Sequence, residues 1–190
     1  MTKEMIDEMI FDLQRFDGDE IYIATAADET VRIAKSSGSL TATSQKAGYN
    51  AKKLKPVTKG NTISGVNAAA GDDYINVAAE VENISILGGR GADTLDLATR
   101  TASGGITYVY NYGDGLDVIR GWDSDKDVLV IDGDWYSPVM SDDGNKFLIN
   151  YGSGQIAFEG LEYGKTIKVQ TPDGVIPYTV ERIFNLRRQC

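Results

Sequence analysis

Gly88-Gly89-Arg90-Gly91-Ala92-Asp93-Thr94-Leu95-Asp96 is the stretch of this sequence that decides how the rest is interpreted. It matches, at every fixed position, the nonapeptide pattern G-G-x-G-x-D-x-U-x, in which U is a large apolar residue. The glycines let the backbone turn sharply and expose its carbonyl oxygens, while the aspartate supplies a charged oxygen and the apolar residue anchors a strand. The stretch therefore predicts a tight turn that is also half of a metal site.

Two weaker copies of the pattern flank this one. Residues 70–75 keep the Gly-x-Asp-x-apolar half, and residues 112–119 lack only the first glycine. The aligned aspartates are Asp73, Asp93 and Asp117, so the spacings are 93−73 = 20 and 117−93 = 24 residues. Each spacing has room for two short strands and two turns.

The sequence between the copies supplies strands that mostly alternate apolar and polar residues, as half-buried strands do. They are expected at 74–77, 84–87, 94–97 and 106–110. Glycine–aspartate turns then recur on one edge, and residues 78–83 and 99–105 form the other. In this arrangement the three aspartates stack, and a cation between neighbouring turns relieves their repulsion.

The chain resembles the RTX, or haemolysin-type, calcium-binding repeat proteins. In addition, residues 108–131 and 149–160 are similar to a module of large bacterial surface proteins that carry such repeats. Together the two resemblances cover residues 61–160. Ala68 and Ala69 depart from the pattern, because they stand where the first turn would have glycines.

The resemblance implies a calcium-binding parallel β-roll that is secreted or displayed on the surface of a bacterium. The motif copies and the resemblance together predict Ca²⁺ as the cofactor and no catalytic residues. The predicted metal site comprises Asp73, Gly89, Gly91, Asp93, Gly113, Gly115, Asp117 and Asp127.

Charge is unevenly distributed along the 190 residues. Residues 1–60 have a net charge of zero, residues 61–145 of −11 and residues 146–190 of +2. An acidic block can be a solvated face, but here the carboxylates gather at the glycine turns, which favours cation binding. The same block disfavours nucleic acid as a partner, since nucleic acid requires a basic surface.

The chain contains no histidine. This removes the Ser-His-Asp and Cys-His arrangements and any zinc site built on imidazole, so the chain is predicted not to be an enzyme. Catalysis by carboxylates or by a metal alone stays open. A single cysteine, Cys190, cannot form a disulfide within the chain. No apolar run approaches the roughly 18 residues of a transmembrane helix.

The spacing of apolar residues and of turn signals predicts the elements near both ends of the chain. Residues 1–16 are predicted to form an amphipathic helix over the open end of the roll, without the features of a secretory signal. Strands are expected at 20–24 and 31–34, followed by a lysine-rich segment at 46–59. Hairpins are expected around 152–154 and 172–174.

The predicted fold class is mostly β: a short RTX-like parallel β-roll (a β-solenoid) with an N-terminal amphipathic helix and a C-terminal antiparallel cap. The segments are 1–60, the lead-in part; 61–135, the roll; and 136–190, the cap. All three are expected to fold as one cooperative unit.

Three functions are compatible with the sequence. The first is a non-enzymatic, calcium-stabilised extracellular structural or adhesive protein that self-associates into oligomers or filaments, head to tail. The second is the secretion and folding module of a toxin or enzyme exported by type I secretion. The third is a phage or particle subunit, because residues 11–16 resemble the openings of some phage structural proteins. The localisation, outside the cell or on the cell surface, is inferred from calcium chemistry and the resemblance.

Overall fold

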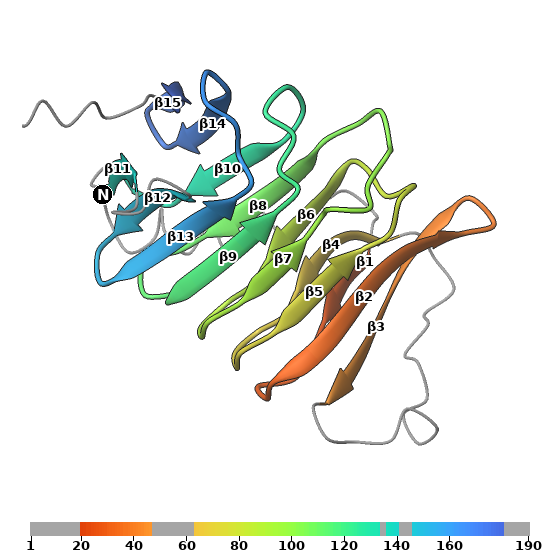
Figure 1. Cartoon of the computed structure of the whole chain (residues 1–190). Helices are drawn as coiled ribbons and strands as arrows, with labels where there is room; N and C mark the ends of the chain where they lie inside the picture. Colours follow the sequence, from red (N-terminus) through yellow and green to blue (C-terminus); the bar gives the residue numbers. More distant parts are fainter. Residues whose placement is uncertain (1–19, 47–62, 134–135, 141–145, 181–190) are drawn as a thin grey trace, which may run out of the picture.

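The computed structural model of the chain describes residues 20–46, 63–133, 136–140 and 146–180, and these residues contain strands and no helix (Figure 1). The predicted helix at 1–16 and most of the lysine-rich segment lie outside the described residues. None of the described segments forms a helix that could span a membrane. The strands are β1 (Glu20–Ile23), β2 (Glu29–Ser36), β3 (Ser39–Lys46), β4 (Ile63–Asn67), β5 (Tyr74–Val77), β6 (Ile84–Leu87), β7 (Thr94–Asp96), β8 (Ile106–Tyr110), β9 (Leu116–Arg120), β10 (Val128–Ile131), β11 (Tyr136–Met140), β12 (Lys146–Tyr151), β13 (Gly154–Glu159), β14 (Thr166–Thr171) and β15 (Gly174–Thr179).

The strands form two open sheets. Sheet A has the order β1-β4-β6-β8-β10-β14-β15, and sheet B has the order β11-β12-β13-β9-β7-β5-β2-β3. From β4 to β10 the chain alternates between the sheets, and neighbouring strands in each sheet are parallel. Strands from successive copies of the glycine pattern therefore lie side by side, as Figure 1 shows for β5, β7 and β9.

Alternation of apolar and polar residues explains how the sheets pack. In β2, Val31 and Ile33 are fully buried, whereas Thr30 and Arg32 are exposed. Each buried aliphatic side chain of this size contributes about 1.5–3 kcal/mol. The inner faces of both sheets supply one continuous core, whose largest fully buried side chains are Tyr108, Tyr110, Phe158, Ile33, Ile75, Ile86, Leu95, Leu97, Ile106, Ile119, Leu129 and Ile131.

The described residues are mostly β, as predicted, but the rest of the predicted fold class is wrong. The described residues form a β-sandwich of two mixed, mostly parallel sheets, not a short β-roll followed by a separate antiparallel cap. The antiparallel hairpins extend the two sheets: β13 pairs in parallel with β9, and β14 pairs in parallel with β10. The physical reason is that β9 and β10 would otherwise be edge strands with unpaired backbone donors and acceptors. β13 and β14 satisfy these groups by pairing with them.

Several individual strands were predicted correctly. Those expected at 74–77, 84–87 and 106–110 are β5, β6 and β8, and the hairpins around 152–154 and 172–174 are β12–β13 and β14–β15. The proposed segment boundaries after residues 60 and 135 stay predictions.

Candidate metal centre

Two sets of turns connect the sheets, one on each edge of the sandwich. Residues 24–28, 68–73, 88–93 and 111–115 lead from sheet A strands to sheet B strands, and we call this side the glycine-turn edge. Residues 78–83, 97–105 and 121–127 lead back to sheet A, and we call that side the opposite edge.

Neighbouring turns on the glycine-turn edge are stacked by backbone hydrogen bonds. The Gly71 N–H donates to the Arg90 carbonyl at 2.8 Å, and the Gly91 N–H donates to the Asp114 carbonyl at 2.6 Å. The Arg90 N–H in turn donates to the Ala69 carbonyl at 3.1 Å. These hydrogen bonds therefore hold each turn in register with the next one.

Glycine is required at three of the predicted positions because of this stacking. Gly89, Gly91 and Gly115 have φ values of +96°, +142° and +120°, which residues with a side chain rarely adopt. A Cβ atom at each of them would overlap a carbonyl oxygen of the preceding turn, that of Ala69, Gly71 or Gly91 respectively. Gly113 also has a positive φ, of +88°, but a Cβ there would meet nothing within 4 Å.

The predicted aspartates of the three turns lie in one line. Asp73, Asp93 and Asp117 are only 2%, 1% and 2% exposed, and Glu29, the first residue of β2, extends the line. The Glu29 N–H donates to Asp73 Oδ1 at 2.8 Å, the Asp73 N–H to Asp93 Oδ1 at 2.8 Å, and the Asp93 N–H to Asp117 Oδ1 at 3.1 Å. We call these four residues the carboxylate column.

Two oxygens of the column are left without a protein partner. Asp73 Oδ2 and Asp93 Oδ2 are completely buried, and neither accepts a hydrogen bond from the described residues. By contrast, Asp117 Oδ2 accepts a hydrogen bond from the buried Tyr108 hydroxyl at 2.7 Å. Unsatisfied buried acceptors are rare and unfavourable, so Asp73 Oδ2 and Asp93 Oδ2 indicate a missing partner.

The space next to Asp93 Oδ2 results from a glycine of the motif. A Cβ at Gly88 would lie 2.5 Å from both Asp93 Oδ2 and the Tyr108 hydroxyl oxygen. The absence of that carbon leaves the two oxygens facing the same point. They are hard oxygen donors of the kind that calcium binds.

Burial changes the acidity of the column. It raises the pKa of Asp93 to about 8, an effect opposed by the hydrogen bond from the Asp73 N–H and increased by the negative charges of Asp117 and Asp73. For the same main reason the pKa of Asp73 is raised to about 6 and that of Asp117 to about 6. A buried carboxylate without a cation therefore retains its proton more strongly than a solvated one.

The structure brings further carboxylates to this edge that the pattern did not identify. Asp114 and Asp132 are 5% and 7% exposed, and they accept hydrogen bonds from the Asn111 and Tyr112 N–H groups at 2.7 and 3.2 Å. Burial raises the pKa of Asp114 to about 7. The sequence signal for Asp114 is its place between two glycines of the third copy, but Asp132 and Glu29 have no neighbouring glycine pattern.

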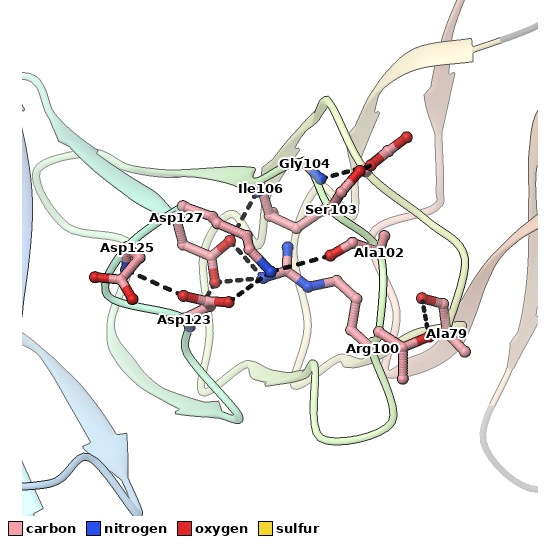
Figure 2. A network of polar contacts seen from close by, with 12 residues as sticks. Ala79, Arg100, Ala102, Ser103, Gly104, Ile106, Asp123, Asp125 and Asp127 are labelled. Carbon is pink, nitrogen blue, oxygen red and sulfur yellow. Dashed lines mark hydrogen bonds and ion pairs between the residues drawn. The ribbon is translucent and has the colours of Figure 1, made fainter.

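Asp127 is the predicted ligand that the structure separates from the others. It lies on the opposite edge and is completely buried, and its two carboxylate oxygens are 2.6 and 2.7 Å from Arg100 Nη2. The N–H groups of Ile106 and Asp123 donate to the same carboxylate at 2.9 and 2.8 Å (Figure 2). Its oxygens are thus satisfied by the protein, and it is not part of the column.

Within the described residues, no three or more acidic, cysteine or histidine side chains converge as the ligands of one ion. The column is linear, so an ion placed between two turns would take one or two carboxylates. Its remaining ligands would be carbonyl, hydroxyl or water oxygens, and calcium accepts such mixed sets of oxygen donors.

No protein-family model matches the chain, and comparison with curated proteins found no match. Among solved structures, the chain is similar to the crystal structure of the extracellular lipase LipA from Serratia marcescens, with 17% sequence identity and a TM-score of 0.45. The similarity covers 73% of this chain and 25% of the lipase chain. The chain therefore spans about a quarter of the length of that protein.

The prediction that the chain is not an enzyme is corrected by this comparison, because the similar structure is that of an enzyme. The prediction relied on the absence of histidine, which excludes imidazole-based mechanisms and leaves carboxylate chemistry available. The similarity assigns no activity to this chain.

Proposed function

We propose that this chain is an RTX-type extracellular structural or adhesive protein that binds calcium at the glycine-turn edge and self-associates. The observation that carries the proposal is the pair of buried oxygens without a partner, Asp73 Oδ2 and Asp93 Oδ2. Both belong to stacked copies of a glycine–aspartate pattern, so a cation would stabilise the connection between successive turns.

The donor set favours calcium over other metal ions. The groups available at this edge are carboxylate, carbonyl and hydroxyl oxygens, whereas zinc and copper sites use imidazole or thiolate. Magnesium requires a compact octahedral shell and retains most of its water molecules. A line of carboxylates within a flexible set of backbone carbonyls suits the larger and more variable shell of calcium.

The residues of this edge have distinct roles in the proposal. Gly89, Gly91 and Gly115 allow the turns to approach one another, and Gly88 leaves space beside Asp93. The backbone N–H groups of the neighbouring turns hold Oδ1 of each aspartate in place. A bound calcium ion supplies positive charge, which offsets the desolvation and mutual repulsion of the column.

Calcium chemistry also supports the proposed extracellular localisation. Extracellular calcium modules bind at about 10⁻⁴ to 10⁻³ M, a range in which the ion occupies its site outside the cell and leaves it inside. A protein of this kind completes its folding after export. The other two functions considered from the sequence, a secretion module and a phage or particle subunit, stay predictions.

Calorimetric titration with calcium tests the proposal with a matched pair of variants. Asp93→Asn removes the charge of the column residue whose Oδ2 has no partner, and Asp125→Asn removes the charge of an exposed carboxylate on the opposite edge. The wild-type protein and Asp125→Asn should bind calcium with the same affinity, and Asp93→Asn should bind at least one ion fewer. Identical titration curves for all three proteins would refute a site at Asp93.

A further inference from the structure

Each sheet of the sandwich has two edge strands, and the two ends of the molecule differ in how these strands are built. Among the described residues, β1 and β3 are the outermost strands at the end where the described chain begins, and β15 and β11 are outermost at the other end (Figure 1). An edge strand offers a row of backbone N–H and C=O groups to another strand unless something blocks it.

Proline blocks the edge at β15. The β14–β15 hairpin closes with Thr171 opposite Gly174, and hydrogen-bonded pairs then alternate along it with non-hydrogen-bonded pairs. Pro177, opposite Lys168, therefore occupies a non-hydrogen-bonded position, where its nitrogen faces away from β14. Because proline has no N–H, the exposed side of β15 lacks a donor at that point.

The same arrangement occurs at β11. The β12–β13 hairpin closes with Tyr151 opposite Gly154, so the backbone of Ile149 points toward β13. Pro138 is paired with Ile149, and its nitrogen must therefore face away from β12, toward the open side. Both edges at this end thus have a proline where an additional strand would need a donor.

β3 itself contains no proline. It has eight residues and one charged residue, Lys46, at its end. Ser37 and Gly38, with φ values of +50° and +85°, form its turn with β2, and the hairpin closes with Ser36 opposite Ser39. By the same alternation, the backbone groups of Leu40, Ala42, Ser44 and Lys46 face away from β2. β1, the other edge strand at this end, has only four residues.

We propose that β3 pairs antiparallel with β3 of a second copy of the chain, which joins sheet B of the two copies across a twofold axis. An antiparallel pair of identical strands is self-complementary, as a twofold interface requires. Centred on Thr43, this register places Thr43 opposite its symmetry mate and Thr41 opposite Gln45. No like charges meet, and Thr–Thr pairs stabilise neighbouring strands.

This interface rests on the proposed self-association. It names the surface through which the copies associate, and it limits the assembly to two copies. A head-to-tail assembly would need the proline-containing edges of one copy to accept the β1 or β3 edge of the next. The prolines disfavour that contact, so the assembly closes as a dimer and does not extend into filaments.

Light scattering after size exclusion tests the interface on the full chain in calcium. The wild-type protein should have twice the monomer mass of 20.6 kDa. Thr43→Glu places two like charges opposite each other in the dimer, while within one copy the new carboxylate faces Arg32. It should raise the dimer dissociation constant by about fivefold. The control Thr30→Glu, on the same face of β2, should leave the constant unchanged.

Cross-linking provides a second measurement that does not depend on weakening the contact. With Cys190 replaced by serine, Thr43→Cys should form a disulfide-linked dimer under mild oxidation, because its symmetry mate lies directly opposite. Thr30→Cys in the same background should not. A strictly monomeric wild-type protein, assemblies that grow beyond the dimer, or a dimer that Thr43→Cys fails to cross-link would each overturn the inference.

The calcium titration separates this inference from the proposed function. A monomer that binds calcium would overturn the β3 dimer and support the calcium site. A dimer linked through Thr43→Cys that binds no calcium would support the interface and overturn the calcium site.

Discussion

The two edges of the sandwich each bury aspartates completely, but they stabilise the charge in different ways. On the opposite edge, Asp127 has an arginine and two backbone N–H groups as partners, and all of them belong to the protein. On the glycine-turn edge, Asp73 and Asp93 each have one backbone donor on Oδ1 and none on Oδ2. The carboxylate of Asp127 is thus satisfied by the protein, whereas Asp73 and Asp93 each have one buried oxygen that accepts no hydrogen bond from the described residues.

The largest expected effect of a single substitution comes from removing the arginine partner of Asp127. Arg100→Met removes the cation beside Asp127. The side chains of Arg100 and Asp127 are 4% and 0% exposed, respectively. Removing one partner of a buried ion pair typically costs about 3–5 kcal/mol, because the other charge stays buried and unpaired. Urea unfolding should show this loss equally in calcium and in chelator. A loss that appears only in chelator would mean that the two edges are not independent.

The next effect concerns the stacking of the glycine turns. Gly115→Ala introduces a Cβ that overlaps the Gly91 carbonyl oxygen, whereas Gly113→Ala, in the same turn, meets nothing within 4 Å. Both substitutions place alanine at a positive φ, which costs about 1–3 kcal/mol. Gly115→Ala should therefore lower the free energy of unfolding by more than Gly113→Ala, and only Gly115→Ala should also weaken calcium binding. Equal losses in calorimetry and urea unfolding would argue against the stacking.

A smaller effect per pH unit follows from the acidity of Asp93. Its pKa in the folded protein is raised to about 8, above the value of about 4 expected in the unfolded chain. In chelator, the stability contributed by this group is thus fully present below about pH 4 and is lost as the pH rises to about 8. The slope is at most about 1.4 kcal/mol per pH unit.

Urea unfolding of the wild-type protein and of Asp93→Asn, in chelator from pH 4 to pH 8, isolates this contribution. The wild-type protein should lose stability relative to Asp93→Asn as the pH rises, and saturating calcium should reduce the difference. Parallel profiles for the two proteins in chelator would show that Asp93 is ionised in both the folded and unfolded states.

The sequence predicted the glycine-turn edge more accurately than it predicted the fold. The turn at residues 88–96 is determined by its own glycines and aspartate. Alignment of the motif copies therefore placed three buried aspartates, Asp73, Asp93 and Asp117, in one line. Glu29 joins that line through a hydrogen bond to a residue 44 positions away, and no glycine marks it. Contacts of that range are set by the pairing of β2 with β5, not by any local pattern.

Two of the differences from the predictions, the place of Asp127 and the role of the C-terminal strands, have the same origin. Asp127 resembles a ligand in the acidic run from 123 to 127, and only its pairing with Arg100, 27 residues earlier, shows that its charge is already neutralised. The strands after residue 136 have the alternation of a separate antiparallel unit. Their membership of the two sheets depends on parallel pairing with β9 and β10. Periodicity identifies strands, but it does not identify their neighbours.

The most direct test of the difference between the edges is a crystal structure of the full chain grown in calcium. A calcium ion should lie about 2.3–2.6 Å from Asp93 Oδ2, in the space beside Gly88, while Asp127 remains paired with Arg100. Calcium bound only to carboxylates of the opposite edge, with Asp93 Oδ2 contacting water or no group at all, would contradict the account.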